Sequence, residues 1–234
     1  MRLCRGPHRP TLVTTVKIIT TADGSHSLLN EALHETYHSH HGAVQESMHV
    51  FIEHGLHHLL RQSPDKNISI LEIGFGTGLN VLLTWRALRG AETTVRYTSI
   101  ESFPLDRSVW GVLNYALDDE KVIFENMHAS AWNEWVGLSP AFQLYKWNTT
   151  LQQASLGATL FDLVYYDAFA PGKQPEMWTR EMLTKVVSQL RPGGVLVTYC
   201  AKGQLKRDLK ALGLEVESLQ GPPGKKEMTR ATKR

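Results

Sequence analysis

The stretch that most constrains the fold is residues 68–80, where a short apolar run is followed by three glycines and then by a helical pattern. The run Ile68–Ile73 is rich in β-branched residues, which is typical of a strand buried in a sheet. Gly74, Gly76 and Gly78 follow at alternate positions, and leucines then recur with helical spacing. A strand, a glycine turn and a helix in this order predict a ligand-binding turn at the carboxyl edge of an open α/β sheet.

The spacing of these glycines narrows the class of ligand. A dinucleotide turn has the pattern G-x-G-x-x-G and a mononucleotide loop needs Gly-Lys-Ser/Thr, but here the pattern is G-x-G-x-G without a following lysine. Glu72 precedes the glycines, and E-x-G-x-G-x-G resembles the first motif of S-adenosylmethionine-dependent methyltransferases. Glu101 ends the next strand, where related folds place the acid that holds ribose hydroxyls. Together these features favour a cofactor site over a plain strand-to-helix turn.

The overall composition excludes some classes of protein. A chain of 234 residues fits one α/β domain with additions, and a net charge of +2 leaves any nucleic-acid partner to a local basic patch. Cys4 and Cys200 follow no metal or redox spacing, so we expect reduced thiols in a cytoplasmic protein. No apolar run approaches the length needed to span a membrane, so we expect no membrane partner.

The pattern of apolar runs predicts an alternation of strands and helices, and therefore a mostly parallel sheet. Seven strands are expected at residues 68–73, 95–101, 142–147, 161–167, 195–200, 214–219 and 227–231. Helices are expected at 43–61, 79–88, 104–117, 175–190 and 202–212, with short ones near 129–136 and 150–156. Before the core, the pattern predicts a β-hairpin that includes residues 12–20 and a helical turn at 28–33.

A second motif follows the strand 161–167. It reads Asp167-Ala-Phe-Ala-Pro-Gly-Lys-Gln-Pro-Glu-Met-Trp-Thr179 and begins with an acid at a strand end. The carboxyl ends of parallel strands meet at one edge of a sheet, so Asp167 is expected to lie beside the glycine turn. The motif therefore predicts a carboxylate that faces the bound cofactor.

Several blocks together resemble the methyltransferase half of the bifunctional tRNA-modifying MnmC family. They are Glu72-Ile-Gly-Phe-Gly-Thr-Gly-Leu-Asn80, Glu101-Ser-Phe-Pro-Leu105, Asp167-Ala-Phe-Ala-Pro171, Pro175-Glu-Met-Trp-Thr179 and Arg191-Pro-Gly-Gly194. The blocks Tyr37-His-Ser39, Glu46-Ser47 and Gly224-Lys-Lys-Glu-Met228 extend the resemblance to residues 21–228. The block that begins at Asp167 is far more specific than the glycine motif.

The resemblance implies a Rossmann-like class I methyltransferase fold, with a mostly parallel seven-stranded sheet and an N-terminal hairpin and helix extension. We expect this extension to be residues 1–62 and the methyltransferase domain to be residues 63–234. The implied reaction is the methylation, by S-adenosyl-L-methionine, of the amino group of 5-aminomethyl-2-thiouridine at the tRNA wobble position. The FAD-dependent oxidase half of the family has no counterpart motif in this chain, so we expect a stand-alone methyltransferase.

The resemblance also implies a set of site residues. Cofactor contacts are expected from Tyr37, Glu46, Glu72, Gly74, Gly76, Gly78, Asn80, Glu101, Thr150 and Asp167. Asp167 is in addition the expected catalytic residue, which accepts a hydrogen bond from the substrate amine and aligns it. The chain departs from the family at Ala168, where glycine is usual, and at Thr150, where an acid for the adenine amino group is expected. Asn148 or Thr149 would then make that adenine contact.

Contacts with tRNA are expected from residues of two kinds. Phe169 and Trp178 offer faces on which an extruded base stacks, although aromatic residues at such positions are more commonly core residues. Phosphate contacts are expected from Lys173, Lys202, Lys206, Arg207, Lys210, Lys225, Lys226 and Arg230. For residues 202–210, a solvated helix face is the alternative interpretation.

Nine histidines lie between His26 and His58, but no cysteine or acid accompanies them at a ligand spacing, so no metal is expected. Two other functions stay open. An aminopropyltransferase shares the fold, but it generally carries more acids in the loop after Asp167. A non-catalytic tRNA-binding module is compatible with the change at Thr150.

Overall fold

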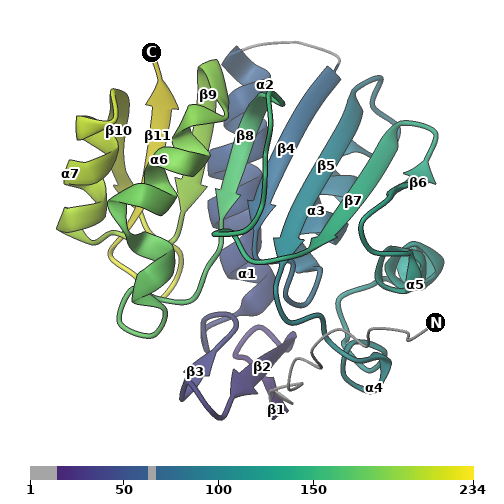
Figure 1. Cartoon of the computed structure of the whole chain (residues 1–234). Helices are drawn as coiled ribbons and strands as arrows, with labels where there is room; N and C mark the ends of the chain where they lie inside the picture. Colours follow the sequence, from purple (N-terminus) through teal and green to yellow (C-terminus); the bar gives the residue numbers. More distant parts are fainter. Residues whose placement is uncertain (1–14, 63–66) are drawn as a thin grey trace, which may run out of the picture.

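A computed structural model describes residues 15–62 and 67–234 (Figure 1). Within these residues, an eight-stranded sheet has helices on both faces, and a small three-stranded sheet lies below one edge of it. The strand order of the large sheet is β10-β11-β9-β8-β4-β5-β7-β6.

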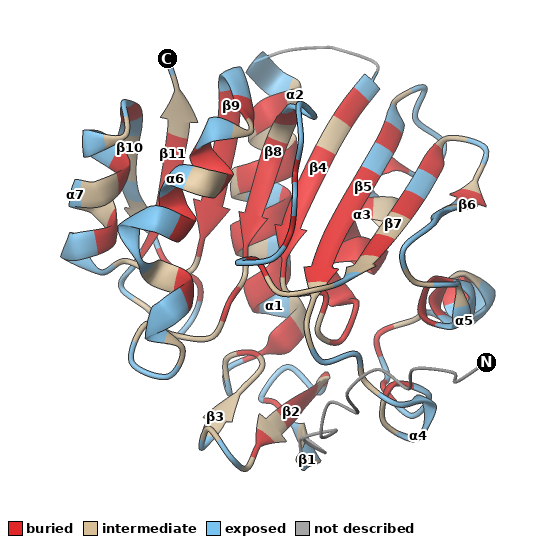
Figure 2. Cartoon of the chain, in the orientation of Figure 1, coloured by how far each residue is buried: buried red, intermediate tan, exposed pale blue. Residues whose placement is uncertain are grey.

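The centre of the sheet consists of five parallel strands. They are β4 Asn67–Ile73, β5 Thr94–Glu101, β7 Phe142–Asn148, β8 Phe161–Tyr166 and β9 Leu190–Thr198. Successive side chains of a strand enter opposite faces, and in β8 Leu163 joins one apolar core whereas Val164 joins the other. β4 and β8 are therefore buried on both faces over most of their length, which is why their sequences consist of nearly continuous apolar runs (Figure 2).

The remaining strands pair antiparallel at the two sides of the sheet. They are β10 Leu214–Gln220, β11 Glu227–Lys233 and β6 Trp135–Ser139. The mostly parallel α/β class is confirmed, but the expected number of seven strands is wrong because β6 lies where the pattern predicted a short helix. Trp135 pairs with Tyr145 and Val136 with Leu144, so these side chains alternate between the faces as in any strand.

The helices form two layers around the sheet. One layer comprises the continuous helical segment α1 Ala43–Ser47, η1 Met48–His57 and α2 His58–Gln62, with α3 Leu79–Leu88 and α5 Lys121–Ala129. The other layer comprises η3 Pro175–Trp178, α6 Arg180–Ser188 and α7 Gly203–Ala211. Two short helices, α4 Arg107–Trp110 and η2 Asp118–Glu120, lie in the connection after β5. In the described part of the chain, no helix is long and apolar enough to cross a bilayer.

The small sheet consists of β1 Val16–Thr20, β2 His26–Asn30 and β3 Glu35–Thr36. The expected hairpin is confirmed for β1 and β2, while its first residues, 12–14, lie outside the described residues. The helical turn predicted for 28–33 is wrong, because Leu28 and Leu29 belong to β2 and pair with β1.

Two further predicted helices are absent or much shorter in the structure. Only 107–110 of the helix predicted for 104–117 is helical. The chain turns away after it because Asn114 and Tyr115 bind the small sheet, through Asn114 Nδ2 to the Gly24 carbonyl (2.9 Å) and the Tyr115 hydroxyl to the His26 carbonyl (2.7 Å). The predicted helix 150–156 is a turn whose Leu151, Ala154 and Leu156 are buried in the core.

Candidate active site

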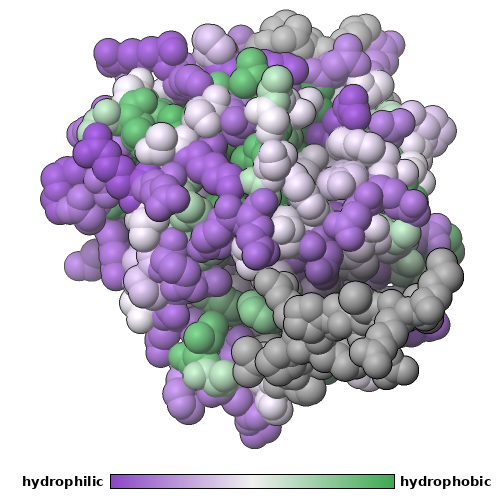
Figure 3. Space-filling model, viewed as in Figure 1, coloured by the Kyte–Doolittle hydropathy of each residue, from purple (hydrophilic) through white to green (hydrophobic). Residues whose placement is uncertain are grey.

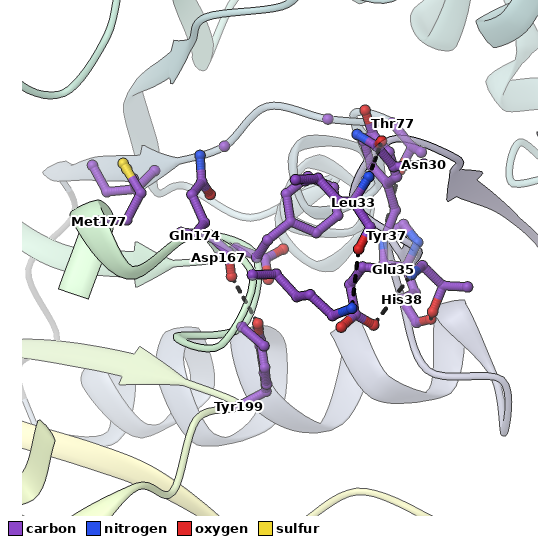
Figure 4. A pocket seen from close by; sticks show the side chains of 18 of the residues that line it. Asn30, Leu33, Glu35, Tyr37, His38, Thr77, Asp167, Gln174, Met177 and Tyr199 are labelled. Atoms are coloured by element: carbon purple, nitrogen blue, oxygen red, sulfur yellow. Dashed lines mark hydrogen bonds between the residues drawn. The ribbon is translucent and has the colours of Figure 1, made fainter. Parts of the chain in front are cut away.

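The carboxyl ends of β4, β5 and β8 meet the small sheet at a cavity of about 630 Å³. Its walls come from segments far apart in the sequence, including Tyr37 and His38, the glycine turn after β4, Glu101 and Asp167. Figure 4 shows Asp167, Tyr37 and Tyr199 approaching this space from different parts of the chain. The position at the strand ends agrees with the prediction from the glycine turn.

The glycine turn has a backbone that only glycine adopts readily. Gly74, Gly76 and Gly78 have φ angles of 97°, 50° and 72°. The first two line the cavity, and a Cβ on Gly76 would come within 3.3 Å of the Tyr37 ring. Gly78 does not line the cavity; it precedes α3, and a Cβ there would lie 2.4 Å from Met127 Cε. Gly78 therefore allows the turn to form and allows α3 to pack closely against Met127.

Glu101 lines the cavity with its carboxylate held in place by the backbone. Oε2 accepts a hydrogen bond from the Gly76 N–H (2.9 Å) and Oε1 accepts one from the Phe103 N–H (2.8 Å). Burial raises the pKa of Glu101 against the opposing effect of these bonds. The arrangement fixes one carboxylate beside the glycine turn, as the sequence predicted.

Thr150 is not part of the cavity wall, and neither are Asn148 and Thr149. The Thr150 hydroxyl instead accepts a hydrogen bond from the Gln153 N–H (3.2 Å) and caps a turn. The neighbouring wall is apolar, with Ile100 and Leu151. The expected adenine contact by a side chain at 148–150 therefore has no support from this geometry.

Glu72 lies behind the cavity rather than in its wall. It is fully buried, accepts a hydrogen bond from the Ser99 hydroxyl (2.6 Å), and burial raises its pKa to about 8. Asn80 separates it from the cavity, since Asn80 Nδ2 donates both to Glu72 (3.0 Å) and to Asp167 Oδ2 (2.9 Å). Glu72 therefore does not reach the cavity directly, and its expected contact with the cofactor stays a prediction.

Asp167 is the carboxylate that the fold brings next to the glycine turn. Its N–H donates to the Ile73 carbonyl (3.1 Å), which continues the pairing of β8 with β4, and its side chain lines the cavity. Burial, together with the nearby charge of Glu46, raises the pKa of Asp167 to about 7, against the hydrogen bond from Asn80. An acid with this pKa exchanges a proton near neutral pH.

Glu46 and Lys225 form an ion pair in the cavity wall although they are far apart in the sequence. Lys225 Nζ lies 2.5 Å from Glu46 Oε1 and 3.8 Å from the centre of the Tyr199 ring. Glu46 Oε2 also accepts the Ser39 N–H (2.7 Å). Lys225 was expected to bind phosphate, but in the structure its ammonium group is paired with Glu46. Lys226 is exposed and does not line the cavity.

Of the aromatic and basic residues predicted to contact the substrate, some line the cavity and others do not. Phe169 lines the cavity and packs edge-on against Tyr37, with ring centres 5.0 Å apart. Trp178 does not line it; the indole N–H donates to the Phe169 carbonyl (2.7 Å) and the ring packs on Tyr166. Lys173 lines the cavity, and its Nζ donates to the Leu33 and His34 carbonyls (3.0 and 3.2 Å).

The other predicted phosphate contacts are mostly engaged within the protein. Arg230 binds Glu217 through two hydrogen bonds (2.7 and 2.9 Å), Lys206 pairs with Glu227, and Arg207 donates to Gln204 (2.8 Å). Lys202 and Lys210 are exposed.

Two residues of the cavity wall were not predicted from the sequence. His38 is buried, its ring bonds Ser27 (3.2 Å), and burial lowers its pKa to about 4, so it is neutral at pH 7. The Tyr199 hydroxyl donates to the Ala168 carbonyl (2.7 Å) and so supports the loop after Asp167. The block Tyr37-His-Ser39 was the available signal for His38.

No group of three or more His, Cys, Asp or Glu side chains positioned to hold a metal occurs within the described residues.

Known proteins of two kinds resemble this chain: a methyltransferase family and the MnmC proteins. Residues 144–234 match the family described as S-adenosyl-L-methionine-dependent methyltransferase. The tRNA 5-methylaminomethyl-2-thiouridine biosynthesis bifunctional protein MnmC of Cupriavidus necator is 32% identical over 213 residues, which cover 85% of this chain and 32% of that protein. The counterpart in Nitrosospira multiformis is 28% identical over 207 residues, with coverages of 83% and 33%.

The chain thus spans about a third of the length of the curated relatives it matches. Among solved structures, MnmC2 from Aquifex aeolicus superposes with a TM-score of 0.81 and 26% sequence identity, over 96% of this chain and 72% of that chain. The resemblance to the MnmC-like methyltransferases is therefore confirmed, and the chain has the fold of a class I S-adenosylmethionine-dependent methyltransferase.

Proposed function

We propose that this chain methylates the amino group of 5-aminomethyl-2-thiouridine at the wobble position of tRNA in the cytoplasm, with S-adenosyl-L-methionine as methyl donor. The similarity to tRNA 5-methylaminomethyl-2-thiouridine biosynthesis proteins supports the tRNA substrate, and the similarity to S-adenosyl-L-methionine-dependent methyltransferases supports the donor. The observation that carries the proposal is Asp167, a carboxylate with a raised pKa in the cavity next to the glycine turn.

The residues present fit S-adenosylmethionine. Its ribose hydroxyls suit the fixed carboxylate of Glu101, and its positive charges suit a wall that contains Asp167 and Glu46. Asn80 Oδ1 is buried and has no hydrogen-bond partner among the described residues, so an acceptor is left for the ammonium group.

When bound, the cofactor would supply a methyl group on a positively charged sulfur. A neutral amine would displace that sulfur, so that the N–C bond forms as the C–S bond breaks and S-adenosylhomocysteine leaves. The amine of the substrate is largely protonated in water, so a group of the protein must take its proton or hold it aside. An ordinary aspartate with a pKa of about 3.9 is a poor acceptor for that proton. Asp167, with a pKa of about 7, is a better one, and the Asn80 amide keeps its carboxylate oriented.

The direct test is nucleoside mass spectrometry of tRNA that carries the unmethylated aminomethyl base, after incubation with the chain and the cofactor. We expect the methylaminomethyl nucleoside to appear only when protein and cofactor are both present. Isothermal titration with S-adenosylmethionine is run in parallel. Binding of the cofactor without any methylated nucleoside would contradict the proposed substrate, and absence of cofactor binding would favour a non-catalytic module.

The rate of methyl transfer should depend on pH through Asp167. A protonated Asp167 cannot accept the proton, so kcat/KM should fall as the pH is lowered through about 7. Glu46→Gln removes a negative charge that raises the pKa of Asp167 and leaves Lys225, whose charge lowers it, without its partner. The acid limb should therefore move to lower pH, by about one pH unit.

The matched control for this experiment is Glu35→Gln, which also removes a negative charge from the cavity wall. Glu35 is not among the groups that shift the pKa of Asp167, so its profile should follow the wild type. The substrate amine titrates identically in all three proteins, so any difference belongs to the enzyme. Equal shifts in both variants would contradict a specific effect of Glu46 on Asp167.

A further inference from the structure

On one face of the eight-stranded sheet, no helix covers the half formed by β5, β7 and β6. In Figure 1, α6 lies in front of the sheet on the side of β8 and β9, and α7 beyond it at β10, whereas no helix lies in front of β5 and β7. The reason is the connection from β7 to β8, because residues 149–160 form turns and no helix. Several side chains that β5, β6 and β7 direct to this face, among them Arg96 and Trp135, are therefore exposed to solvent, and Figure 2 shows pale blue and tan bands on these strands.

The open face presents a row of aromatic rings. Trp135 of β6 lies beside Tyr145 of β7, with ring centres 5.3 Å apart, and Tyr145 lies beside Trp147, with centres 6.0 Å apart. Trp135 is 41% exposed, which is unusual for so large a side chain in a strand. These rings line a hollow of about 560 Å³, separate from the cavity described above.

The charged side chains that line the hollow are positive. Among the described residues that line it, Arg96 and Arg191 are the charged ones, and none is acidic. The guanidinium of Arg96 lies 4.4 Å from the centre of the Trp135 ring, and no ion pair engages it within the described residues. Arg191 is paired with Asp162 at 2.7 Å. Figure 3 shows this side of the molecule over β5 and β7 as mostly purple and pale side chains.

We propose that this open face, made of Arg96, Trp135, Tyr145, Trp147 and Arg191, binds unpaired nucleotides of RNA. Bases would stack on the aromatic rings and phosphates would pair with the arginines, which is how single-stranded nucleic acid is held without base-specific hydrogen bonds. The inference rests on the proposed function in taking the RNA to be tRNA, and it adds the surface that holds it.

The position of the open face suits this role. Trp147 directly precedes Asn148, which pairs with Glu101 of the cavity wall, so β7 leads from the open face to the edge at which the cavity lies. A protein partner would instead be expected to cover exposed aliphatic side chains. Among the lining residues, Leu160 is the one exposed large aliphatic side chain, at 39%. The aromatic rings and unpaired arginine favour RNA.

The test is fluorescence anisotropy with a labelled anticodon stem-loop RNA and with a labelled single-stranded oligouridine. Trp135→Ala should weaken binding of both RNAs by about tenfold, and Trp135→Phe should retain most of the affinity because it keeps a stacking face. Arg96→Gln should weaken binding and reduce the slope of log affinity against log salt by about 1.

Arg89→Gln is the matched control, because Arg89 also lies over a tryptophan ring, 5.6 Å from the centre of Trp85, and its loss changes the net charge equally. It lies at the end of α3 on the opposite face of the sheet, so RNA affinity should stay as in the wild type. Circular dichroism and S-adenosylmethionine affinity verify that every variant is folded.

The two proposals can fail separately. If the wild type methylates no tRNA but binds RNA through Trp135 and Arg96, the proposed function fails and the open face stands. If Trp135→Ala and Arg96→Gln bind both RNAs like the wild type, the assignment of the open face to RNA is overturned, whatever the activity, and a protein partner becomes its occupant. If methylation occurs, both variants should raise KM for tRNA severalfold at unchanged kcat.

Discussion

Asp167→Asn is expected to reduce kcat for methyl transfer by about 10²- to 10⁴-fold while S-adenosylmethionine still binds. The amide has the shape of the carboxylate and its oxygen can still accept the hydrogen bond from Asn80 Nδ2. Its other end, however, is an NH₂ donor, which cannot take a proton from the substrate amine or accept a hydrogen bond from it. The loss should therefore appear in kcat under saturating tRNA and cofactor.

The measurement pairs single-turnover methyl transfer with isothermal titration of the cofactor. Asp208→Asn, on α7 and away from the cavity, changes the net charge equally and should leave both values unchanged. If kcat of the Asp167→Asn enzyme lies within a few-fold of the wild-type value, Asp167 neither accepts the proton of the substrate amine nor aligns that amine. A loss confined to cofactor affinity would make it a binding residue only.

Gly74→Ala is expected to weaken cofactor binding by at least about tenfold and to lower the melting temperature. A φ of 97° at residue 74 costs an alanine about 1–2 kcal/mol. In addition, the new Cβ would lie 2.8 Å from the backbone oxygen of Asp167, which cannot rotate away. The turn and Asp167 must then separate, so the strain falls on the two groups that face the cofactor. The conformational cost alone predicts a drop of about 2–8 °C.

Gly213→Ala separates the two effects. Gly213 has a φ of 87°, but a Cβ built there meets no atom within 4 Å, so the substitution carries only the conformational cost. We expect Gly213→Ala to lower the melting temperature modestly and to bind S-adenosylmethionine like the wild type. If calorimetry and titration show Gly74→Ala to be no worse than Gly213→Ala, the close packing of the turn on Asp167 is unimportant for the site.

The elements that depend on local pattern were predictable from the sequence. Apolar runs that end at glycines or acids identified β4 and β8, since a strand buried on both faces is apolar along most of its length. A run of Val, Tyr, Thr and Ile residues that ends at Glu101 identified β5. Their parallel arrangement then placed Glu101 and Asp167 beside the glycine turn. One of the departures from the predicted pattern is β6, where the short-range pattern could not distinguish an edge strand from a helix.

The tertiary structure alone decided which polar groups reach the cavity. Glu72 belongs to the same motif as the glycines, yet it is fully buried, and Asn80 of α3 separates it from the cavity. Lys225 reads as a free cation in the sequence, yet it pairs with Glu46, 179 residues earlier. Sequence spacing determined which strands end together; side-chain direction and long-range pairing, which depend on how the whole chain packs, determined the chemistry of the wall.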